Sequence, residues 1–328
     1  MSNFWIDLPK PIFSAAPMED VTDTVFREIL LRRSDIRTLN VVCTEFVATD
    51  GICHEVGVEN VSHRFVVSDS ERELLKSRNT KIIAQIWGAK PENFYRSIKF
   101  ITETYQFDGI DINMGCPVKK IVRQSGGAFL TREPELAKEI IEASKSATSL
   151  PISVKTRTGD IEPQIEIWIK ALAEAKPDAI TLHGRTRSMM YKGLADWNDI
   201  KKAKELVKSI SPETVFIGNG DIHSLSEANE QIAFSGVDGV MVGRAMMSNP
   251  WIFSTNAHNV SVEMRLHVLL EHAGLFDEVW GKSKPFAVLK KFFKAYINSF
   301  NGASELRQKL MTCSNLEDLE NLIAYYSL

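Results

Sequence analysis

The sequence predicts an α/β protein, a (β/α)8 TIM barrel followed by a small C-terminal all-helical domain. Two observations support this fold class. Through most of the chain eight short β-branched runs alternate with longer amphipathic stretches, and after Trp251 the strand signal stops. Nearly continuous apolar strands that alternate with helices are typical of a parallel sheet buried on both faces. Eight such units predict a closed barrel.

Each expected strand is a short apolar run bounded by turn residues or by a helical pattern. In chain order the runs cover residues 11–15, 40–44, 81–85, 109–113, 151–155, 179–183, 214–218 and 239–243. Helical patterns such as 134–146 and 165–175 lie between them. The runner-up is an open doubly wound sheet. That fold favours a Gly-x-Gly-x-x-Gly turn after its first strand, whereas here Ala15 is followed by Ala-Pro-Met-Glu-Asp.

Residues 262–328 carry helical patterns only, so we expect a catalytic barrel over residues 1–255 and a helical domain over residues 256–328. In the stretch 286–297 the apolar residues recur at i, i+3 and i+4, which predicts one amphipathic helix. Lys290, Lys291 and Lys294 fall away from its apolar face. Residues 282–309 hold seven basic residues against one acid, which makes this region a candidate surface for a polyanion.

Composition and charge exclude several classes of protein. The 328 residues are 44% hydrophobic and 25% charged, which excludes disordered and collagen-like chains. Lysine and arginine number 39 against 42 acids, a net charge of −3, so a polyanionic partner requires a local basic patch. No apolar stretch reaches the roughly 18 residues of a membrane span, and the start lacks a signal-peptide pattern, so we expect a soluble, cytoplasmic protein.

The cysteines are scattered without a Cys-x-x-Cys pair, so we expect neither a disulfide framework nor a metal site. Nothing in the sequence requires a protein partner. Any cysteine that acts in function therefore acts as a thiol.

The active site of this fold is assembled at the carboxyl ends of the strands, and nearly every expected strand ends in a polar residue. In order these residues are Pro17, Met18 and Glu19, then Glu45, Gln85, Asn113 with Cys116, Lys155 with Arg157, His183, Asn219 with Gly220 and Asp221, and Gly243 with Arg244. The last two turns occupy the usual phosphate position of the fold, where small residues let backbone N–H groups approach an anion. They predict a phosphorylated ligand.

Two further residues indicate chemistry at the barrel mouth. Lys155 suits a Schiff base, a phosphate contact or the stabilisation of a reduced flavin, and lysine alone does not choose among them. Cys116 precedes the loop of residues 118–127, which ends in two glycines and carries no acid but three cations, Lys119, Lys120 and Arg123. We interpret this loop as a mobile basic lid with a thiol at its root.

Several motifs together resemble the tRNA-dihydrouridine synthase family over almost the whole chain. They are Ala-Pro-Met at 16–18, Asp-Ile-Asn-Met-Gly-Cys-Pro at 111–117, Val-Lys-Thr-Arg-Thr-Gly at 154–159, Leu-His-Gly-Arg-Thr at 182–186, Gly-Asn-Gly-Asp-Ile at 218–222 and Gly-Arg-Ala at 243–245. The Asn-x-Gly-Cys-Pro element is the most specific. In the C-terminal region the chain departs from the family's usual Met-Arg-Lys-His, with Leu289, Lys290, Lys291 and Phe292.

The resemblance implies a tightly bound FMN that is reduced by NADPH and then reduces the C5–C6 bond of particular uridines in tRNA. It places Pro17, Met18, Glu19, Gln85, Lys155 and His183 around the flavin, and Asn219, Gly220, Asp221, Gly243 and Arg244 around its phosphate. It places Asn113, Arg157 and Tyr191 against the uracil, with Cys116 as the acid. Contacts to the tRNA are expected from Lys119, Lys120, Arg123, Lys290, Lys291 and Lys294.

Three alternatives remain at this stage. A different FMN barrel, such as a dihydroorotate dehydrogenase or an ene-reductase on a free small molecule, explains the phosphate site but not the basic C-terminal region. An RNA-binding module with a vestigial flavin explains the basic region but gives the thiol no task. A Schiff-base aldolase at Lys155 is less favoured.

Overall fold

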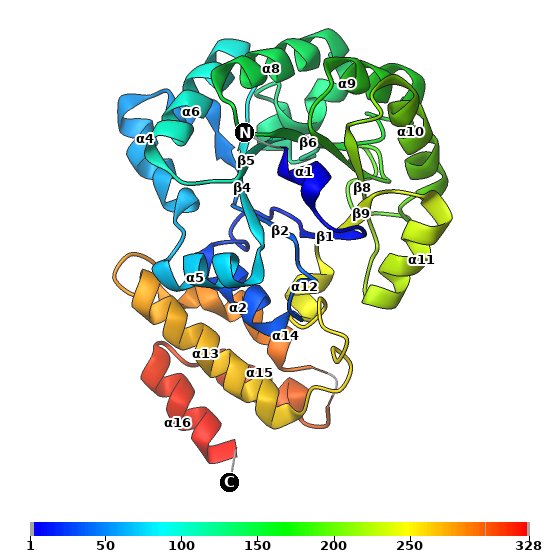
Figure 1. Ribbon diagram of the computed structural model, residues 1–328. Coiled ribbons are helices and arrows are strands. Elements are labelled where there is room, and N and C mark those ends of the chain that lie inside the picture. The colour runs from blue at the N-terminus through cyan, green and yellow to red at the C-terminus, as the bar shows by residue number, and fades with distance from the viewer. Residues whose placement is uncertain (1–2, 299, 327–328) are drawn as a thin grey trace.

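Eight parallel strands close into a barrel in the computed structural model, which describes residues 3–298 and 300–326 (Figure 1). The strands are β1 (Ile12–Ala15), β2 (Val41–Cys43), β4 (Lys81–Trp87), β5 (Gly109–Met114), β6 (Ile152–Arg157), β7 (Ala179–His183), β8 (Val215–Asn219) and β9 (Gly239–Val242). The ring closes because β1 pairs with both β2 and β9, and β2 pairs with β4. A two-residue strand, β3 (Val47–Ala48), also pairs with β4. The predicted fold class is confirmed, with each expected strand in place.

Helices follow the strands around the outside of the barrel (Figure 1). They are α2 (Thr24–Arg33), α3 (Thr49–Ile52), α4 (Glu55–Val61), η1 (Ser62–Phe65), α5 (Asp69–Arg78), α6 (Pro91–Thr104), α7 (Lys119–Val122), η2 (Gly127–Arg132), α8 (Pro134–Ala147), η3 (Ile165–Ile169), α9 (Lys170–Ala175), α10 (Trp197–Ile210), α11 (Leu225–Ser235) and α12 (Ala245–Ser248). The expected helix at 134–146 is α8. The one expected at 165–175 is η3, a π-helical turn, followed directly by α9.

Strand register sets the level at which polar side chains reach the barrel mouth. Gln85 pairs with Asp111 between β4 and β5, and Asn113 pairs with Lys155 between β5 and β6. His183 pairs with Arg157 on one side and with Asn219 on the other. The candidate residues from neighbouring strands therefore lie side by side at the carboxyl ends.

A short helix that sequence reasoning did not single out, α1 (Phe4–Asp7), packs at the centre of the barrel in Figure 1. Phe4 and Trp5 are buried together with the inward residues Ile12, Val41 and Ile217. This apolar cluster fills the barrel interior, so the polar cavity is confined to the opposite, carboxyl end of the strands.

The C-terminal helical region consists of α13 (Val262–Trp280), η4 (Phe286–Phe292), α14 (Phe293–Tyr296), α15 (Ala303–Leu310) and α16 (Leu316–Tyr326). It packs against α2 and shares one apolar core with the outer layer of the barrel. The Phe26 ring of α2 lies 5.0 Å from the ring of Phe292. Just before the expected boundary, Asp35 accepts hydrogen bonds from Ser254 and Thr255.

The single helix expected at 286–297 is instead two short helices, a correction to the sequence analysis. Residues 286–292 form the 3₁₀ helix η4, and α14 follows. In a 3₁₀ helix side chains three residues apart eclipse one another, which aligns Phe286, Leu289 and Phe292 on one face. Leu289 and Phe292 are buried there. The apolar spacing thus predicted the buried face but not the tighter helix.

Candidate active site

A cavity of about 370 Å³ opens at the carboxyl ends of the strands. Most of the residues expected at the site line it: Pro17, Met18, Glu19, Asn113, Cys116, Lys155, Arg157, His183, Tyr191, Asn219, Gly220, Asp221, Gly243 and Arg244. Other residues that line the cavity were not predicted from the sequence, among them Phe46, Met241 and Met247. Phe46 directly follows Glu45, the polar residue after β2, and this position could have predicted that Phe46 lies at the barrel mouth.

Beneath the cavity a chain of hydrogen bonds orients Asn113. Ser153 donates to the Asp111 carboxylate at 2.6 Å, and the Gln85 amide donates to the other oxygen of that carboxylate at 2.6 Å. The Asn113 amide nitrogen in turn donates to the Gln85 amide oxygen at 3.0 Å. Gln85 is fully buried and lies behind Asn113 instead of on the cavity wall. Its expected contact with a flavin ring stays a prediction.

The turn that carries Cys116 is fixed by its neighbours. The Asn113 side-chain oxygen accepts from the N–H groups of Gly115 and Cys116, at 3.1 and 2.9 Å. Arg157 Nε donates to the Gly115 carbonyl at 2.7 Å. Gly127 has a φ of +58°, and a Cβ on it would lie 2.7 Å from the Cys116 carbonyl oxygen, so glycine is required there.

Burial raises the pKa of the Cys116 thiol, and the nearby Glu19 acts in the same direction. The thiol is therefore protonated at neutral pH. Its location on the cavity wall, together with this protonation, suits it to donate a proton to a bound ligand.

Lys155 supplies a positive charge at the floor of the cavity. Its Nζ donates to the Asn219 side-chain oxygen at 3.2 Å, and Asn219 is itself held by a 2.7 Å bond to the Met241 carbonyl. Burial lowers the pKa of Lys155 to about 8, helped by the neighbouring Arg157 and opposed by Asp111. The amine of Lys155 is thus mainly charged at neutral pH. An anionic ligand beside it favours the charged form and raises its pKa.

Arg157 is held rigidly beside the thiol. One of its terminal nitrogens donates to the carbonyls of Thr186 and Met190, at 3.0 and 2.9 Å. Its guanidinium lies 5.8 Å from the centre of the Tyr191 ring, and the guanidinium of Arg244 lies 5.3 Å from that same ring. The half-exposed Tyr191 ring therefore bridges the two ends of the cavity.

The turns after β8 and β9 form the end of the cavity expected to hold phosphate. Gly220 and Asp221 have φ values of +130° and +50°. The Asp221 carboxylate accepts from Arg185 at 2.6 Å and from Arg244 at 3.0 Å. These bonds lower the pKa of Asp221 even though burial acts to raise it. Because two arginines compensate Asp221, this end of the cavity carries an excess of positive charge.

Arg185, which the sequence analysis gave no role, also sets the proton position on His183. A terminal nitrogen of Arg185 lies 3.1 Å from His183 Nε2. Since a guanidinium only donates, Nε2 accepts this bond and the ring proton sits on Nδ1. Burial, reinforced by the charge of Lys155, lowers the pKa of His183 well below its usual value, so the ring is neutral. The His-Gly-Arg-Thr motif was the available signal for Arg185.

The remaining predicted cations lie outside the cavity. Lys119, Lys120 and Arg123 are exposed on α7 and the turn after it. Lys290 donates to the Met311 carbonyl at 2.7 Å, Lys291 donates to the Asp20 carbonyl, and Lys294 is exposed on α14. Two of these three C-terminal lysines are thus bonded to backbone within the protein. Their contacts with tRNA stay predictions.

Residues 3–298 and 300–326 hold no cluster of side chains that suits a metal ion. No helix among them has the length and apolarity needed to cross a membrane.

A family profile and similar sequences indicate one family. The profile of a family described as dihydrouridine synthase matches residues 14–326. The chain is 39% identical over 324 residues to a probable tRNA-dihydrouridine synthase of Staphylococcus epidermidis, covering 98% of this chain and 95% of that protein. It is 37% identical over 324 residues to the probable tRNA-dihydrouridine synthase 2 of Bacillus subtilis, with the same coverage of both chains.

Among solved structures, the fold resembles a 2-naphthoyl-CoA reductase, with a TM-score of 0.52 and 12% identity over 76% of this chain and 52% of that one. It also resembles a 6-hydroxypseudooxynicotine amine oxidase from Pseudomonas geniculata, with a TM-score of 0.52 and 14% identity over 86% of this chain and 56% of that one. This chain spans about half the length of both. At such identities the likeness shows the fold alone.

Proposed function

The chain belongs to the dihydrouridine synthase family, and we propose that it reduces the C5–C6 double bond of uridines in tRNA with bound FMN, using NADPH as the reductant. Family membership makes it an oxidoreductase that acts on tRNA. The observation that carries the finer proposal is the composition of one cavity, in which a protonated thiol shares the walls with Lys155, Arg157 and Arg244.

The cavity fits FMN by the chemistry of its donors. FMN carries a phosphate at one end and a ring with a polar edge at the other. Arg244 and the glycine turns after β8 and β9 match the phosphate, while Lys155 on the floor matches the ring edge. The neutral His183, with its proton on Nδ1, adds a donor that carries no charge. FMN supplies a hydride from N5 of its reduced ring.

Uracil reduction needs one hydride and one proton. Hydride addition at C6 places negative charge on C5 and O4, because the C5–C6 bond is conjugated with the C4 carbonyl. Cys116 gives its thiol proton to C5, and the resulting thiolate is reprotonated from solvent. Arg157, whose guanidinium is fixed beside the thiol, stabilises the charge at O4. One spare N–H of Asn113 remains for the base.

The proposed substrate requires base flipping. A uracil stacked in folded tRNA does not reach the floor of a barrel cavity, so the nucleotide is extruded at a cost of about a few kcal/mol. Contacts with the tRNA backbone offset this cost. We assign these contacts to the exposed cations Lys119, Lys120 and Arg123 on the loop that follows Cys116. Since tRNA is found in the cytoplasm, we expect the protein there.

The test isolates the proton transfer from the other steps. Enzyme that has been reduced with NADPH is mixed rapidly with unmodified tRNA, and flavin reoxidation is followed by absorbance. Removal of a positioned acid is expected to slow this step by about 10²–10⁴-fold in Cys116→Ala, with flavin content and reduction by NADPH unchanged. Cys53→Ala serves as the matched control, because Cys53 contacts Asn93 and Ser97 outside the cavity.

Three outcomes contradict the proposal. Purified protein that is colourless and does not take up FMN excludes the cofactor. An unaltered rate of reoxidation in Cys116→Ala shows that the acid lies elsewhere. Free uridine is included as a second substrate, because efficient reduction of the nucleoside favours a barrel oxidoreductase acting on small molecules over a tRNA enzyme.

A further inference from the structure

We propose that the C-terminal helical region supports the cofactor cavity itself, because Lys291 and Lys284 hold the loop of residues 16–23 in the conformation that lines it. Lys291 is then a positioning residue for the cofactor, and not a ligand of tRNA phosphate. The inference rests on the proposed function, since it takes FMN as the occupant of the cavity.

The loop in question joins β1 to α2 and forms one wall of the cavity through Pro17, Met18 and Glu19. Its ends are tied together, since Thr22 Oγ1 accepts from the Met18 N–H at 3.0 Å and the Thr22 N–H donates to the Met18 carbonyl at 3.0 Å. At its apex Asp20 has a φ of +58°. A residue with a Cβ adopts this left-handed region uncommonly, and Asp does so more readily than most.

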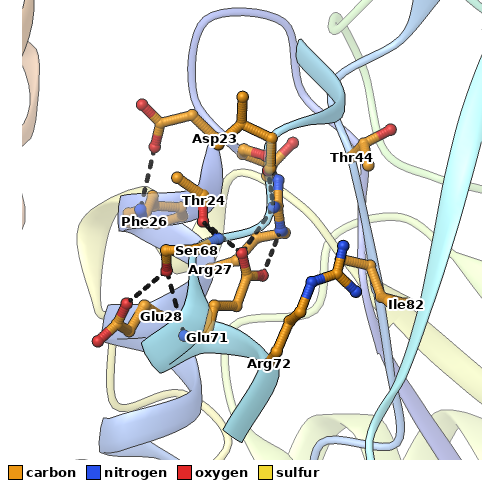
Figure 2. A network of polar contacts seen from close by, with 12 residues as sticks. Asp23, Thr24, Phe26, Arg27, Glu28, Thr44, Ser68, Glu71, Arg72 and Ile82 are labelled. Carbon is orange, nitrogen blue, oxygen red and sulfur yellow. Dashed lines mark hydrogen bonds and ion pairs between the residues drawn. The ribbon is translucent and has the colours of Figure 1, made fainter. Parts of the chain in front are cut away.

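The C-terminal end of the loop is fixed by α2 and α5, two helices of the outer layer of the barrel. Arg27 of α2 and Glu71 of α5 form a fully buried ion pair at 2.6 Å, and Figure 2 shows them facing each other with Thr24 bonded to the same carboxylate. Another nitrogen of Arg27 donates to the Thr22 carbonyl at 2.7 Å. This network holds Thr22, but it does not reach the apex at Asp20.

The apex is fixed from the C-terminal helical region. Lys291, from η4, donates to the Asp20 carbonyl. Lys284 Nζ lies 3.7 Å from the Asp23 carboxylate and 3.7 Å from the centre of the Trp280 ring. On the barrel side the Asp20 N–H donates to Glu45 at 2.6 Å. The two peptide groups that flank Asp20 are therefore bonded from opposite sides, one by each region of the molecule.

Charge also argues against tRNA phosphate at Lys291. The charged groups that act on Lys291 are three carboxylates, from Asp20, Asp23 and Glu45, and one other cation, Lys284. The acids outnumber the cations, so a phosphate brought to this point meets net repulsion. The pattern is that of a lysine that compensates acids of a loop.

The test compares Lys291→Met with Lys282→Met, a substitution at an exposed lysine of the same region. Dissociation of FMN is measured by fluorescence with the apoprotein. If the loop of Lys291→Met occupies the binding conformation about a tenth of the time, the dissociation constant rises about tenfold. Hydrogen exchange is measured on the same apoprotein, where the Val21 and Thr22 amides, which donate to the Met18 carbonyl, are expected to exchange faster. Lys282→Met changes neither quantity.

Further variants and outcomes keep the inference separate from the proposed function. Lys284→Met is expected to act in the same direction with a smaller shift, and Lys291→Arg, which keeps a donor, restores part of the affinity. If wild-type protein does not bind FMN, the proposed function fails, while the exchange rates still test the support of the loop. Unchanged FMN affinity and exchange in Lys291→Met overturn the inference. So does a variant that loses only tRNA affinity and its salt dependence, because that result assigns Lys291 to phosphate.

Discussion

The polar residues of the barrel mouth gather in one site, whereas those of the C-terminal helical region do not. At the mouth, residues far apart in the sequence, such as Cys116 and Arg244, meet in one cavity. In the helical region Lys290, Lys291 and Lys294 lie within five residues, yet Lys290 bonds Met311, Lys291 bonds a loop of the barrel and Lys294 faces solvent.

The difference lies in what each pattern determines. In a parallel barrel the carboxyl ends of all strands lie at the same face. A polar residue at a strand end therefore lies at that face as well. A short helix on a surface determines only which side is apolar, and a lysine on the other side reaches whatever acceptor lies within the length of its side chain. The two regions therefore predict different consequences for substitutions.

The largest expected effect lies where the two regions meet, at α2. Arg27→Met leaves the Glu71 carboxylate buried without its partner, and breaking such a pair costs about 3–5 kcal/mol of unfolding free energy. Arg32→Met, on the same helix, is expected to cost less, because the Arg32 side chain is 36% exposed and the buried Glu28 carboxylate keeps hydrogen bonds from Ser68 and Ser70. Urea unfolding measures both variants.

Hydrogen exchange during that unfolding shows whether the regions form one cooperative unit. Because they share a core, α8 of the barrel and α13 of the helical region are expected to lose protection together. Loss of protection in α13 well before α8 contradicts this and makes the helical region an independent domain.

The second effect concerns the phosphate end of the cavity. If Arg244 binds the FMN phosphate as proposed, Arg244→Ala removes a charge-assisted hydrogen bond and is expected to weaken FMN binding by about 1.5–3 kcal/mol. The affinity for tRNA is expected to persist, because this arginine belongs to the cofactor end of the site. Calorimetry with the apoprotein measures the change, and Lys192→Ala, at an exposed lysine of the neighbouring loop, is the control. Equal FMN affinities in the two variants place the phosphate elsewhere.

The sequence predicted the parts of the molecule that depend on repeating patterns. The strands, the buried face of 286–297 and the gathering of Lys155, His183 and Asn219 at one end all follow from periodicity and topology. Other features depend on contacts between distant segments. The Asp20 carbonyl and Lys291 are 271 positions apart, and no local pattern pairs them. Likewise the strand-end position of Gln85 gave its level in the barrel but not the hydrogen bond that turns it toward Asn113.

A third prediction uses pH to test Lys155. Its pKa of about 8 in the ligand-free protein lies below the ordinary value of a lysine because of burial. An anionic ligand favours the charged form, so FMN binding takes up a proton above pH 8 and takes up none below it. The affinity is therefore expected to be constant from about pH 7 to 8 and to fall at most tenfold per unit above that. Titrations of the apoprotein measure this.

Lys155→Met is the matched control for the pH dependence. The variant is expected to bind FMN more weakly at neutral pH and to lose the decline above pH 8. If the decline persists unchanged in the variant, another group titrates and Lys155 does not contact the anionic part of the ligand.

The smallest expected effect separates two lysines of the C-terminal helical region that the sequence treated alike. Lys294 faces solvent on α14, whereas Lys290 is already bonded to the Met311 carbonyl. Loss of one phosphate contact is expected to lower the slope of log affinity against log salt by about one in Lys294→Met. At physiological salt the loss of tRNA affinity is about 1 kcal/mol or less, because the contact is exposed. Lys290→Met leaves the slope unchanged, since its ammonium is not available to tRNA.

Filter binding over a salt series measures both variants, with FMN affinity as the internal control. If the salt slopes of the two variants are equal, the hydrogen bond of Lys290 to the protein does not keep this lysine from tRNA. The two lysines then act alike, and the contrast drawn between this region and the barrel mouth is wrong.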